Sequence, residues 1–554
     1  MFHIRLSFAL CLLVLLPARV SALEILVPSP SATIQAAIDI ATDGDTVKVS
    51  PGRYLENLLI DRKSITLCSA NPEDAAVVSA TVIDGQNKSA CIIVRNIAGE
   101  PCVVSGFTVT NGGSSENTTE RGGVFCENSK LSLRSNVITG NSGGAGGGVS
   151  CRGSDVLLKS CLLVGNKAYT GGALYADAGS ACTISSCGII GNECAALGAG
   201  ILSASRSIEV LDTQIIGNLG IVPSGGITQG GGITVRPAPG LGRAMIFCRN
   251  CEISENWAAP GGGILLNGSD AIIENCRFVG NIVGAIYSTG ESFVCSNSMF
   301  FANRDRYPSA GRSCILLRSC SPAVITNSLI CGNTAGVTAE DTLLNLSNDT
   351  VVFNGSFGSA NVGCTILHAT NSIFYPAGIF VSDPSSTSIG HSSVSNAEVS
   401  YGPGNIVNIT NPPLFVDPGY WDTSSDPYVE PGWTFVLGDY HLLPGSPSID
   451  AGTNDVDSPY TPEVETLPAT DLAGIPRVID GNRDGCATVD MGAYEYLPGD
   501  VNNDGKVNVL DLILVRNSIG RDPASFPAAR KADLNNDGKV NVLDLIAARN
   551  GLQR

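Results

Sequence analysis

A column of asparagines recurs along the chain and constrains its fold more than any other sequence feature. Stretches such as "LKSCLLVGN" and "ISSCGIIGN" each end in it. Its members are Asn141, Asn166, Asn192, Asn218, Asn256, Asn281, Asn303 and Asn333, at steps of 25, 26, 26, 38, 25, 22 and 30 residues, and "GFTVTN" adds Asn111 upstream. Self-similarity at a period of about 20 to 50 residues is typical of architectures in which each repeat stacks on the next.

A short strand pattern follows each asparagine, in segments such as "GGVSC", "GGALYA" and "GGILL". One set of alternate positions is apolar: Val124, Val149, Leu174, Ile201, Ile233, Ile264 and Ile286. The other set is mixed: Phe125, Ser150, Tyr175, Leu202, Thr234, Leu265 and Tyr287. This alternation predicts a strand with one buried face, and the preceding glycines permit the bend into it. Coils of about 25 residues built from such strands predict a parallel β-helix, an all-β solenoid with coils about 4.8 Å apart.

Stacking turns each column into a ladder of like side chains. We expect the asparagines to form a buried amide ladder inside a turn, because a row of amides satisfies its own hydrogen bonds. Cysteines also fall into columns: Cys161, Cys187, Cys251 and Cys276 in one, and Cys126 and Cys151 in another that points inward. The same columns hold Ser, Thr, Ala and Asn in other coils, which favours unpaired core thiols. Disulfides between neighbouring coils remain an alternative, since the spacing allows them.

The beginning of the chain predicts export. Residues 1–22 have a basic start, an apolar stretch and small residues before Leu23, the pattern of a secretory signal peptide. No later apolar stretch is long enough to cross a bilayer, so we expect a secreted, extracellular or cell-surface-associated product without membrane insertion. Without Arg5 and Arg19, 31 basic residues stand against 51 acidic ones, a formal charge of −20. Such a charge argues against nucleic acid as a partner and disfavours strongly anionic glycans.

The segment "TIQAAIDIATDGDTVKVSPGRY" predicts a short amphipathic helix, with Ile34, Ala37, Ile38 and Ala41 on one face, and then a strand. It resembles the N-terminal cap of pectin-lyase-like β-helices, and the resemblance, which covers residues 23–410, implies a right-handed parallel β-helix. Residues 411–497, with "DYHLLPGSPSIDAG" and "DGCATVDMGAYEY", resemble the C-terminal region of secreted bacterial proteins of the choice-of-anchor Q type. Within them "DGNRDG" has Asp480, Asn482 and Asp484 spaced as in a calcium loop, but Met491 stands at the twelfth position. We interpret it as a turn.

The chain ends on two copies of an acidic loop, "DVNNDGKVNVLD" and "DLNNDGKVNVLD", each followed by an apolar helical run. Oxygen-bearing side chains fall at positions 1, 3, 5, 9 and 12, a glycine stands at position 6, and the backbone carbonyl at position 7 completes a set suited to Ca2+. The predicted ligands are Asp500, Asn502, Asp504, Lys506, Asn508 and Asp511 in the first loop, and Asp533, Asn535, Asp537, Lys539, Asn541 and Asp544 in the second. We therefore predict two calcium ions.

Two such loops, each leading into one helix, resemble a type I dockerin, and the resemblance covers residues 498–554. It implies a small helical module that binds a cohesin on a scaffold protein. In that family positions 10 and 11 of each loop meet the cohesin, and here they are Val509, Leu510, Val542 and Leu543.

No catalytic signature identifies a reaction, and the catalytic residues stay unknown. The chain has no adjacent Asp-Asp pair, and its four histidines match no Gly-His-Gly segment, which polygalacturonase-like hydrolysis would need. Lys159, Lys167, Arg277 and Arg312 remain individual candidates for a lyase base. Two functions stay open: a lyase or glycoside hydrolase acting on polysaccharide, as is usual for dockerin-bearing proteins, or a non-catalytic β-helix that binds glycan or serves as an adhesive surface. For the second, Phe125, Tyr175, Tyr287, Tyr169 and Trp257 are candidates for stacking on sugar rings.

Overall fold

The computed structural model describes residues 22–29, 31–113, 122–221, 228–240, 242–304, 313–354, 362–376, 378–382, 387–394, 402–407, 412–422, 434–456 and 466–552. Three of the sequence predictions concern positions outside these ranges. They are the signal peptide apart from Ala22, the candidate base Arg312, and the boundary between residues 410 and 411.

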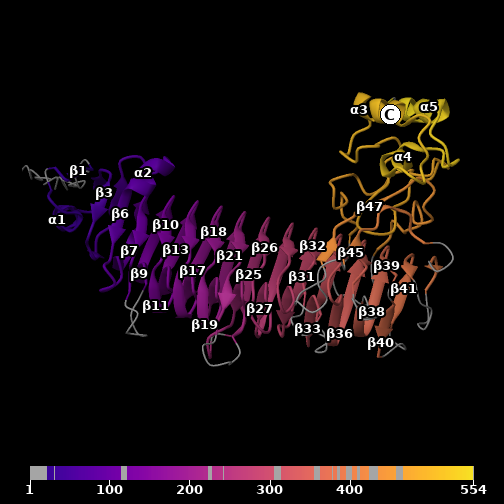
Figure 1. The fold of residues 1–554 in the computed structure, drawn as a ribbon. Coiled ribbons are helices and arrows are strands. Elements are labelled where there is room, and N and C mark those ends of the chain that lie inside the picture. The colour runs from indigo at the N-terminus through magenta and orange to yellow at the C-terminus, as the bar shows by residue number, and fades with distance from the viewer. Residues whose placement is uncertain are drawn as a thin grey trace, which may run out of the picture.

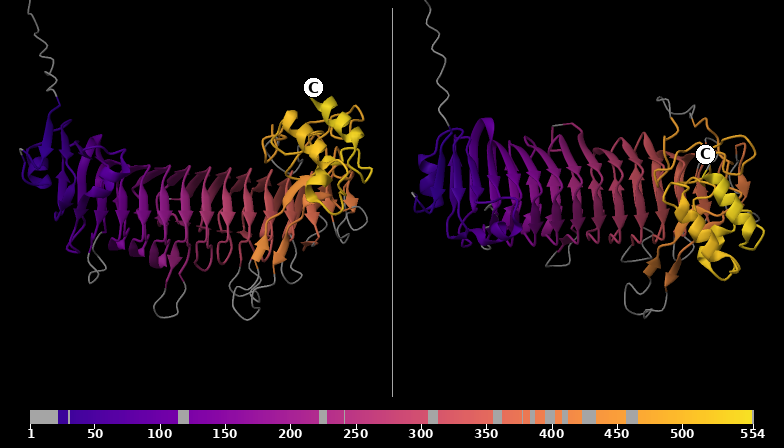
Figure 2. Two further views of the ribbon diagram at one scale, coloured as in Figure 1. Left: turned by 45° about the horizontal axis from the view of Figure 1, so that its top comes forward. Right: turned by 90° about the horizontal axis from the view of Figure 1, so that it is seen from above.

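The chain forms a long parallel β-helix whose strands stack along one axis, with a smaller C-terminal part beside its last coils (Figure 1). The fold predicted from the repeats is therefore confirmed. One coil shows the plan: β10 (Val137–Thr139) and β11 (Ser142–Ala145) belong to two different sheets, and β12 (Val149–Arg152) and β13 (Asp155–Lys159) both belong to a third. The next coil repeats them in register, with Val137 beside Leu162 and Val149 beside Leu174. Seen from above, the stacked coils keep one direction from the N-terminal end to the C-terminal part (Figure 2).

The coils share one continuous apolar core, which runs from Ile25 to Val394. Most inward positions are apolar or cysteine, as with the fully buried Val149 and Cys151 on β12, and in other coils Ser203 and Ser288 stand in the column of Cys151. All 18 cysteines in the described residues are free thiols, and 16 of them are buried. The unpaired-thiol interpretation of the sequence therefore describes this structure, and burial raises the pKa of thiols such as Cys364 to about 12.

The asparagine column forms the predicted amide ladder. Asn166 Nδ2 donates to Asn192 Oδ1 at 3.0 Å, and Asn192 Nδ2 donates to Asn218 Oδ1 at 3.0 Å. Each Oδ1 also accepts the backbone N–H of the asparagine one coil earlier, as between Asn166 N and Asn192 Oδ1 at 2.9 Å. The amides are buried, and every one finds partners among its neighbours. The ladder therefore holds the turns of successive coils in register.

At both ends the asparagine ladder contains other residues than the column aligned in the sequence. Asn111 does not belong to it, because strand register places Gly112 under Asn141, and Asn141 Oδ1 accepts the N–H of Gly112 at 2.8 Å. Asn111 instead donates to Asp84. At the other end Asn333 Nδ2 donates to Asn354 Oδ1 at 2.8 Å, a rung that the alignment missed.

Helix α1 (Ile34–Ile40) covers the N-terminal end of the core. Thr33 caps it, since its hydroxyl accepts the N–H of Ala36. Ile34, Ala37, Ile38 and Ala41 are all buried, as the sequence pattern predicts, and Ile40 points to solvent. The helix thus closes the open end of the core that the first coil would otherwise expose.

Residues 412–496 pack against the outer side of the last coils. Antiparallel pairs β44 (Phe415–Asp417) with β47 (Asp439–Leu442), and β45 (Tyr420–Asp422) with β46 (Thr434–Val436), supply a second apolar cluster around Phe415, Phe435 and Tyr440. That cluster covers outward side chains of β35 (Leu329–Cys331). Arg477 and Glu495 form a buried ion pair at 2.9 Å, and Arg477 also donates to Gly492 O. Arg477 further donates to Asn327 Oδ1 and to Asn348 O of the solenoid, so apolar contacts and hydrogen bonds anchor this region to the β-helix.

Three short helices complete the C-terminal end: α3 (Val509–Ser518), α4 (Pro527–Ala532) and α5 (Val542–Gly551). Helix α2 (Ala75–Ala80) lies near the other end of the molecule. None of the helices in the described ranges is long and apolar enough to span a membrane.

Candidate functional site

The first acidic loop is folded around inward-facing oxygens. Asp500 Oδ2 accepts the N–H of Gly505 at 2.8 Å, and Asn502 Oδ1 accepts the N–H of Asp504 at 3.0 Å. Asp511, fully buried on α3, reaches back to accept the N–H groups of Val501 at 2.8 Å and of Asn508 at 2.8 Å. The loop therefore closes on itself, with Asp504 and Asp511 near enough to Asp500 for their charges to act on it.

The second loop repeats these contacts. Asp533 Oδ2 accepts the N–H of Gly538 at 2.9 Å, and Asn535 Oδ1 accepts the N–H of Asp537 at 3.0 Å. Asp544 on α5 accepts the N–H of Asn541 at 2.8 Å. Asn508 and Asn541 also cap α3 and α5, in each case with a complete capping box. The structure thus brings all the predicted side-chain ligands of each loop into that loop, with Lys506 and Lys539 at the seventh positions.

The carboxylates of each loop alter one another's pKa values. Burial raises the pKa of Asp500, and the neighbouring charges of Asp511 and Asp504 raise it further. The pKa of Asp533 is raised for the same reasons, by burial and by the charges of Asp544 and Asp537. A cation would relieve this repulsion, and carboxylate, amide and carbonyl oxygens are the donors that a hard ion such as Ca2+ prefers. The residues present therefore fit calcium.

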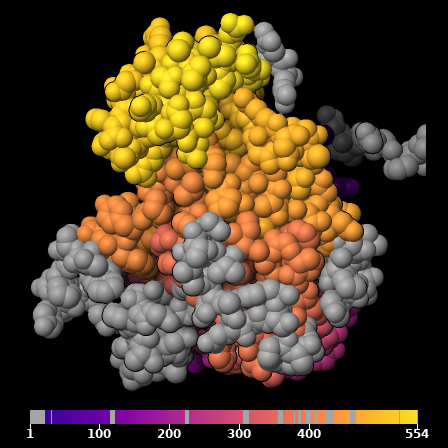
Figure 3. All heavy atoms as spheres, turned by 90° about the vertical axis from the view of Figure 1, so that its right-hand side faces the viewer, coloured from indigo at the N-terminus to yellow at the C-terminus, as the bar shows by residue number. Residues whose placement is uncertain are grey.

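Apolar side chains are exposed where each loop passes into its helix. Val509 and Leu510 begin α3, Val542 and Leu543 begin α5, and between 53% and 62% of each residue's surface is exposed. The two helices lie on the side of this module away from the β-helix (Figure 1), and the module, in yellow, projects from the end of the molecule (Figure 3). Exposed apolar groups in two equivalent positions mark a surface suited to a protein partner.

The opposite side of the module is held against residues 412–496. Lys531, at the end of α4, donates to Asp439 Oδ2 at 2.7 Å, and Asn503 Nδ2 lies 3.4 Å from the same oxygen. His441 Nδ1 is 2.6 Å from Asp439 Oδ1. Burial alone would raise the pKa of Asp439, but His441 and Lys531 hold it well below its ordinary value. This environment favours the charged carboxylate, which holds the module against residues 412–496.

We expect Lys531→Ala to loosen the module by about 1–2 kcal/mol, because it leaves a partly buried carboxylate without its charged donor. Hydrogen exchange in α4 and β47 should then accelerate about tenfold, while exchange in the β-helix stays the same. Lys539→Ala serves as the matched control, since that lysine is exposed. Equal protection of α4 in both variants would show that the contact does not hold the module.

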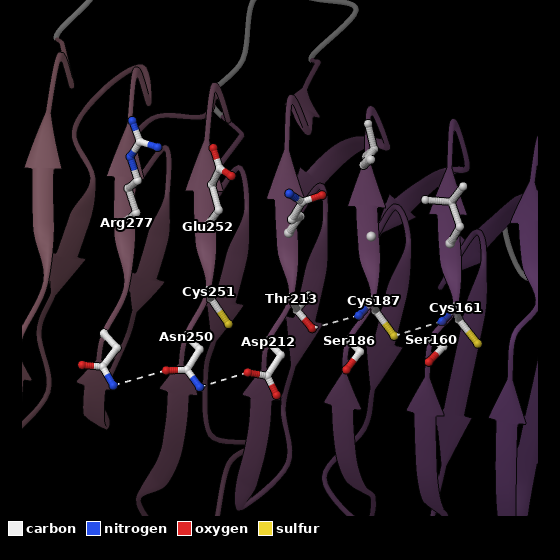
Figure 4. Close-up of a pocket in the computed structure, with 15 residues that line it drawn as sticks. Ser160, Cys161, Ser186, Cys187, Asp212, Thr213, Asn250, Cys251, Glu252 and Arg277 are labelled. Carbon is white, nitrogen blue, oxygen red and sulfur yellow. Dashed lines mark hydrogen bonds between the residues drawn. The ribbon is translucent and has the colours of Figure 1, made fainter. Parts of the chain in front are cut away.

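An open polar groove of about 820 Å³ runs along the corner between two sides of the β-helix (Figure 4). Its floor is the cysteine column, and one wall is a column that the sequence reasoning missed: Ser160, Ser186, Asp212, Asn250 and Asn275. These residues all have φ near +50°, which sharpens the corner. Asn250 Nδ2 donates to Asp212 Oδ1 at 2.9 Å, and Asn275 Nδ2 donates to Asn250 Oδ1 at 3.2 Å. This column could have been found in the sequence, because its members stand directly before Cys161, Cys187, Thr213, Cys251 and Cys276.

The other wall of the groove carries charge. Glu252 on β26 (Glu252–Ser254) stands in register beside Arg277 on β29 (Arg277–Val279), and Figure 4 shows both side chains pointing the same way. The guanidinium of Arg277 also lies 4.9 Å from the ring centre of Phe301. Hydroxyl, carboxylate and amide groups thus repeat about every 4.8 Å along the first wall, while the second wall passes from Leu162 to Gln214, Glu252 and Arg277. This lining offers hydrogen bonds to an extended polymer.

The candidate lyase bases do not converge. Lys167 pairs with Glu193 at 2.8 Å on β15 (Lys167–Thr170), on a different side of the coil from the groove. Lys159 is exposed at the end of β13. Of the three candidates in the described residues, Arg277 alone lines the groove. No base is therefore assigned by the geometry.

The predicted aromatic sugar-binding column is wrong for Phe125, which is 1% exposed. In a later coil the corner before the strand lies close to the outward side chain, since a Cβ on Gly171 would lie 3.0 Å from Tyr175 Cβ. Tyr175, Tyr287 and Trp257 are partly exposed, and Tyr169 is exposed. They do not form one continuous platform with Phe125.

The "DGNRDG" segment forms a turn, as interpreted from the sequence. Asp480 Oδ2 accepts the N–H of Gly485 at 3.1 Å, and Asn482 Oδ1 accepts the N–H of Asp484 at 2.8 Å. Met491, at the twelfth position, is buried in the apolar cluster of residues 412–496. Asp450 instead accepts the N–H groups of residues 481 and 482 from a distant part of the chain. Contacts within the protein thus hold this turn.

Comparison with known proteins identifies the C-terminal module. Residues 498–552 match the model of the Dockerin type I domain. No curated protein matches the sequence. Among solved structures, the chain is similar to a pectin methylesterase from Aspergillus niger, with 15% identity, 49% of this chain and 85% of that chain covered, and a TM-score of 0.26. It is also similar to the Dettilon tailspike protein (13% identity, 65% and 69% covered, TM-score 0.31) and to an alginate lyase from Paenibacillus sp. str. FPU-7 (13%, 65% and 98%, TM-score 0.20).

Proposed function

We propose that this protein is a secreted β-helix that is attached through a calcium-loaded dockerin module to a cohesin-type scaffold protein and acts on polysaccharide. One observation carries the attachment: two loops with the same internal hydrogen bonds each lead into an exposed apolar pair, within a segment that matches the Dockerin type I domain. Two calcium ions, one in each loop, would hold these pairs in place. Val509, Leu510, Val542 and Leu543 would then meet the cohesin.

The polysaccharide part of the proposal rests on the groove. Its length crosses several coils, and its walls offer the donors and acceptors that sugar hydroxyls need. The charged groups among its lining residues are two carboxylates and one guanidinium, from Asp212, Glu252 and Arg277, in a strongly acidic protein. Neutral or weakly acidic plant or algal polysaccharide is therefore the proposed ligand, in preference to fully charged polygalacturonate.

Catalysis by a lyase or a glycoside hydrolase is the first form of this proposal. The second form is a non-catalytic β-helix that binds glycan or acts as an adhesive surface, and the observation that favours it is the lack of convergence among Lys159, Lys167 and Arg277. Both forms use the same groove, so one experiment separates them.

We expect the whole chain, in calcium, to be retarded in gels that contain a neutral or weakly acidic polysaccharide, and less so in polygalacturonate. A lyase product would absorb in the ultraviolet, a hydrolase product would add reducing ends, and a binder would give neither. Glu252→Gln combined with Arg277→Gln should lower the retardation several-fold. Arg249→Gln is the matched control, because Arg249 is exposed outside the groove and pairs with Glu274.

Stronger action on polygalacturonate than on neutral glycans would contradict the charge argument. Retardation that the double variant leaves unchanged would place the glycan elsewhere on the molecule. If no glycan is retarded or cleaved, the polysaccharide proposal fails, while the dockerin attachment stands on its own evidence.

A further inference from the structure

Three thiols meet where the cysteine column passes the inner face of the β-helix. Cys248 belongs to β25 (Ala244–Arg249) and points into the core, whereas Cys251 sits at the corner just before β26. Cys276 occupies the same corner one coil later, before β29. Each of the three is at most 2% exposed. The three sulfur atoms all lie within 4.8 Å of one another, and Cys276 Sγ is 3.8 Å from Cys248 Sγ.

This spacing fits a metal centre. Thiolates bind Zn2+ at about 2.3 Å in a tetrahedron, which places two sulfurs about 3.8 Å apart. Elsewhere in the solenoid thiols meet in pairs, as with Cys151 and Cys182 at 3.9 Å. Among the residues that the structure describes, these three cysteines are the one group of three or more Cys, His, Asp or Glu side chains whose donor atoms come this close.

We propose that Cys248, Cys251 and Cys276 form a three-thiolate site for Zn2+ or another thiophilic divalent cation, taken up while these coils fold. Binding would release the three thiol protons to solvent and form three metal–sulfur bonds. A divalent ion leaves one net negative charge in the core and a monovalent ion would leave two, so burial favours the divalent ion. Calcium, a hard cation that binds oxygen, would not compete for this site.

The site is distinct from the dockerin loops and does not depend on the proposed function. Cys251 also lines the polar groove, so the metal would lie beside solvent and water is available as a fourth ligand. Its role would be to cross-link two coils at the corner that forms the groove floor. Cys248 and Cys251 come from one coil and Cys276 from the next, so the metal would stabilise the groove's shape.

Cobalt provides the test, because tetrahedral thiolate coordination of Co2+ gives an intense charge-transfer absorption. The full chain is unfolded in denaturant under reducing conditions and refolded with excess Ca2+ and one equivalent of Co2+ or Zn2+. We expect one Co2+ per chain with the charge-transfer band, displacement of Co2+ by Zn2+, and a higher Tm with Zn2+ than without it.

Two variants remove the site and are expected to fold. Cys248→Ala places a residue that the same column already holds at Ala369, and Cys276→Ser matches Ser298 in the next coil. Both should reduce the charge-transfer band at least tenfold and abolish the Zn2+-dependent rise in Tm. Cys161→Ser combined with Cys187→Ser is the matched control and should keep both signals.

Three outcomes would overturn the site. The band could be absent from the refolded parent chain, it could persist in Cys248→Ala, or it could be lost equally in the Cys161 and Cys187 control. Circular dichroism of each refolded variant confirms that the β-helix has formed. Mass spectrometry of the alkylated chain that shows a disulfide between any two of the three cysteines, after purification without reductant, would also count against a resident metal.

Discussion

Removing calcium should unfold the dockerin module and leave the β-helix intact. Asp500, Asp504 and Asp511 crowd one small loop, and their counterparts crowd the second, so the folded loops are destabilised when no cation offsets the charge. Chelation of the full chain should therefore melt α3 and α5, seen as lost helical signal and rapid hydrogen exchange over residues 498–552. Capture by a cohesin should be lost in the same samples.

Asp504→Ala with Asp537→Ala should have the same effect at saturating calcium, and calorimetry should show two ions per parent chain and none per variant. Asp480→Ala is the matched control, since it alters the similar "DGNRDG" turn outside the module, and it should leave the stoichiometry at two. Unchanged uptake in the double variant would mean that these loops do not bind the metal. A third ion that disappears in Asp480→Ala would show that the turn itself is a calcium site.

Replacing Asn192 by Leu should destabilise the middle coils by about 2–6 kcal/mol. Asn192 Oδ1 accepts from the backbone N–H and the side chain of Asn166, and its Nδ2 donates to Leu163 O at 3.0 Å and to Asn218 Oδ1 at 3.0 Å. Leucine can replace none of these bonds. Each buried polar group left unsatisfied costs about 1–3 kcal/mol, and at least two are left here, the N–H of Asn166 and the carbonyl of Leu163.

Hydrogen exchange resolved by residue is the suitable measurement, because a solenoid can open locally without global unfolding. Protection should fall in the coils on either side of Asn192 and remain at the two ends. Asn267→Leu is the control, since Asn267 is exposed and its side chain makes a single long contact with Thr289. Similar exchange in the two variants would show that the ladder contributes little to stability.

Periodic features could be read from the sequence because stacking repeats one environment in every coil. The asparagines, the inward apolar positions and the cysteine columns each meet the same neighbours at each level, so a column in the alignment becomes a ladder in space. The two acidic loops were readable for another reason: their predicted ligands lie within twelve residues of one another, and local hydrogen bonds alone shape each loop.

Features that depend on distant or irregular contacts could not be read in this way. The exposure of Phe125 was predicted wrongly because strand alternation shows which side chains point outward and cannot show which of them are covered. Asn111 was misplaced because it stands one residue before the ladder position, which Gly112 occupies in that coil, and strand register alone reveals this. The contact of Lys531 with Asp439 joins residues 92 positions apart, and no local pattern marks it.

That contact determines how far the molecule can move once it is anchored. A flexible linker lets a tethered domain search a volume that grows with linker length. Here the chain passes directly from the buried Glu495 to the first calcium loop at Asp500, and Asp439 fastens the module sideways. The solenoid therefore behaves as a stiff arm on its anchor. The orientation of its groove would follow that of the whole anchoring complex. The groove would reach a nearby polymer only when that complex moves.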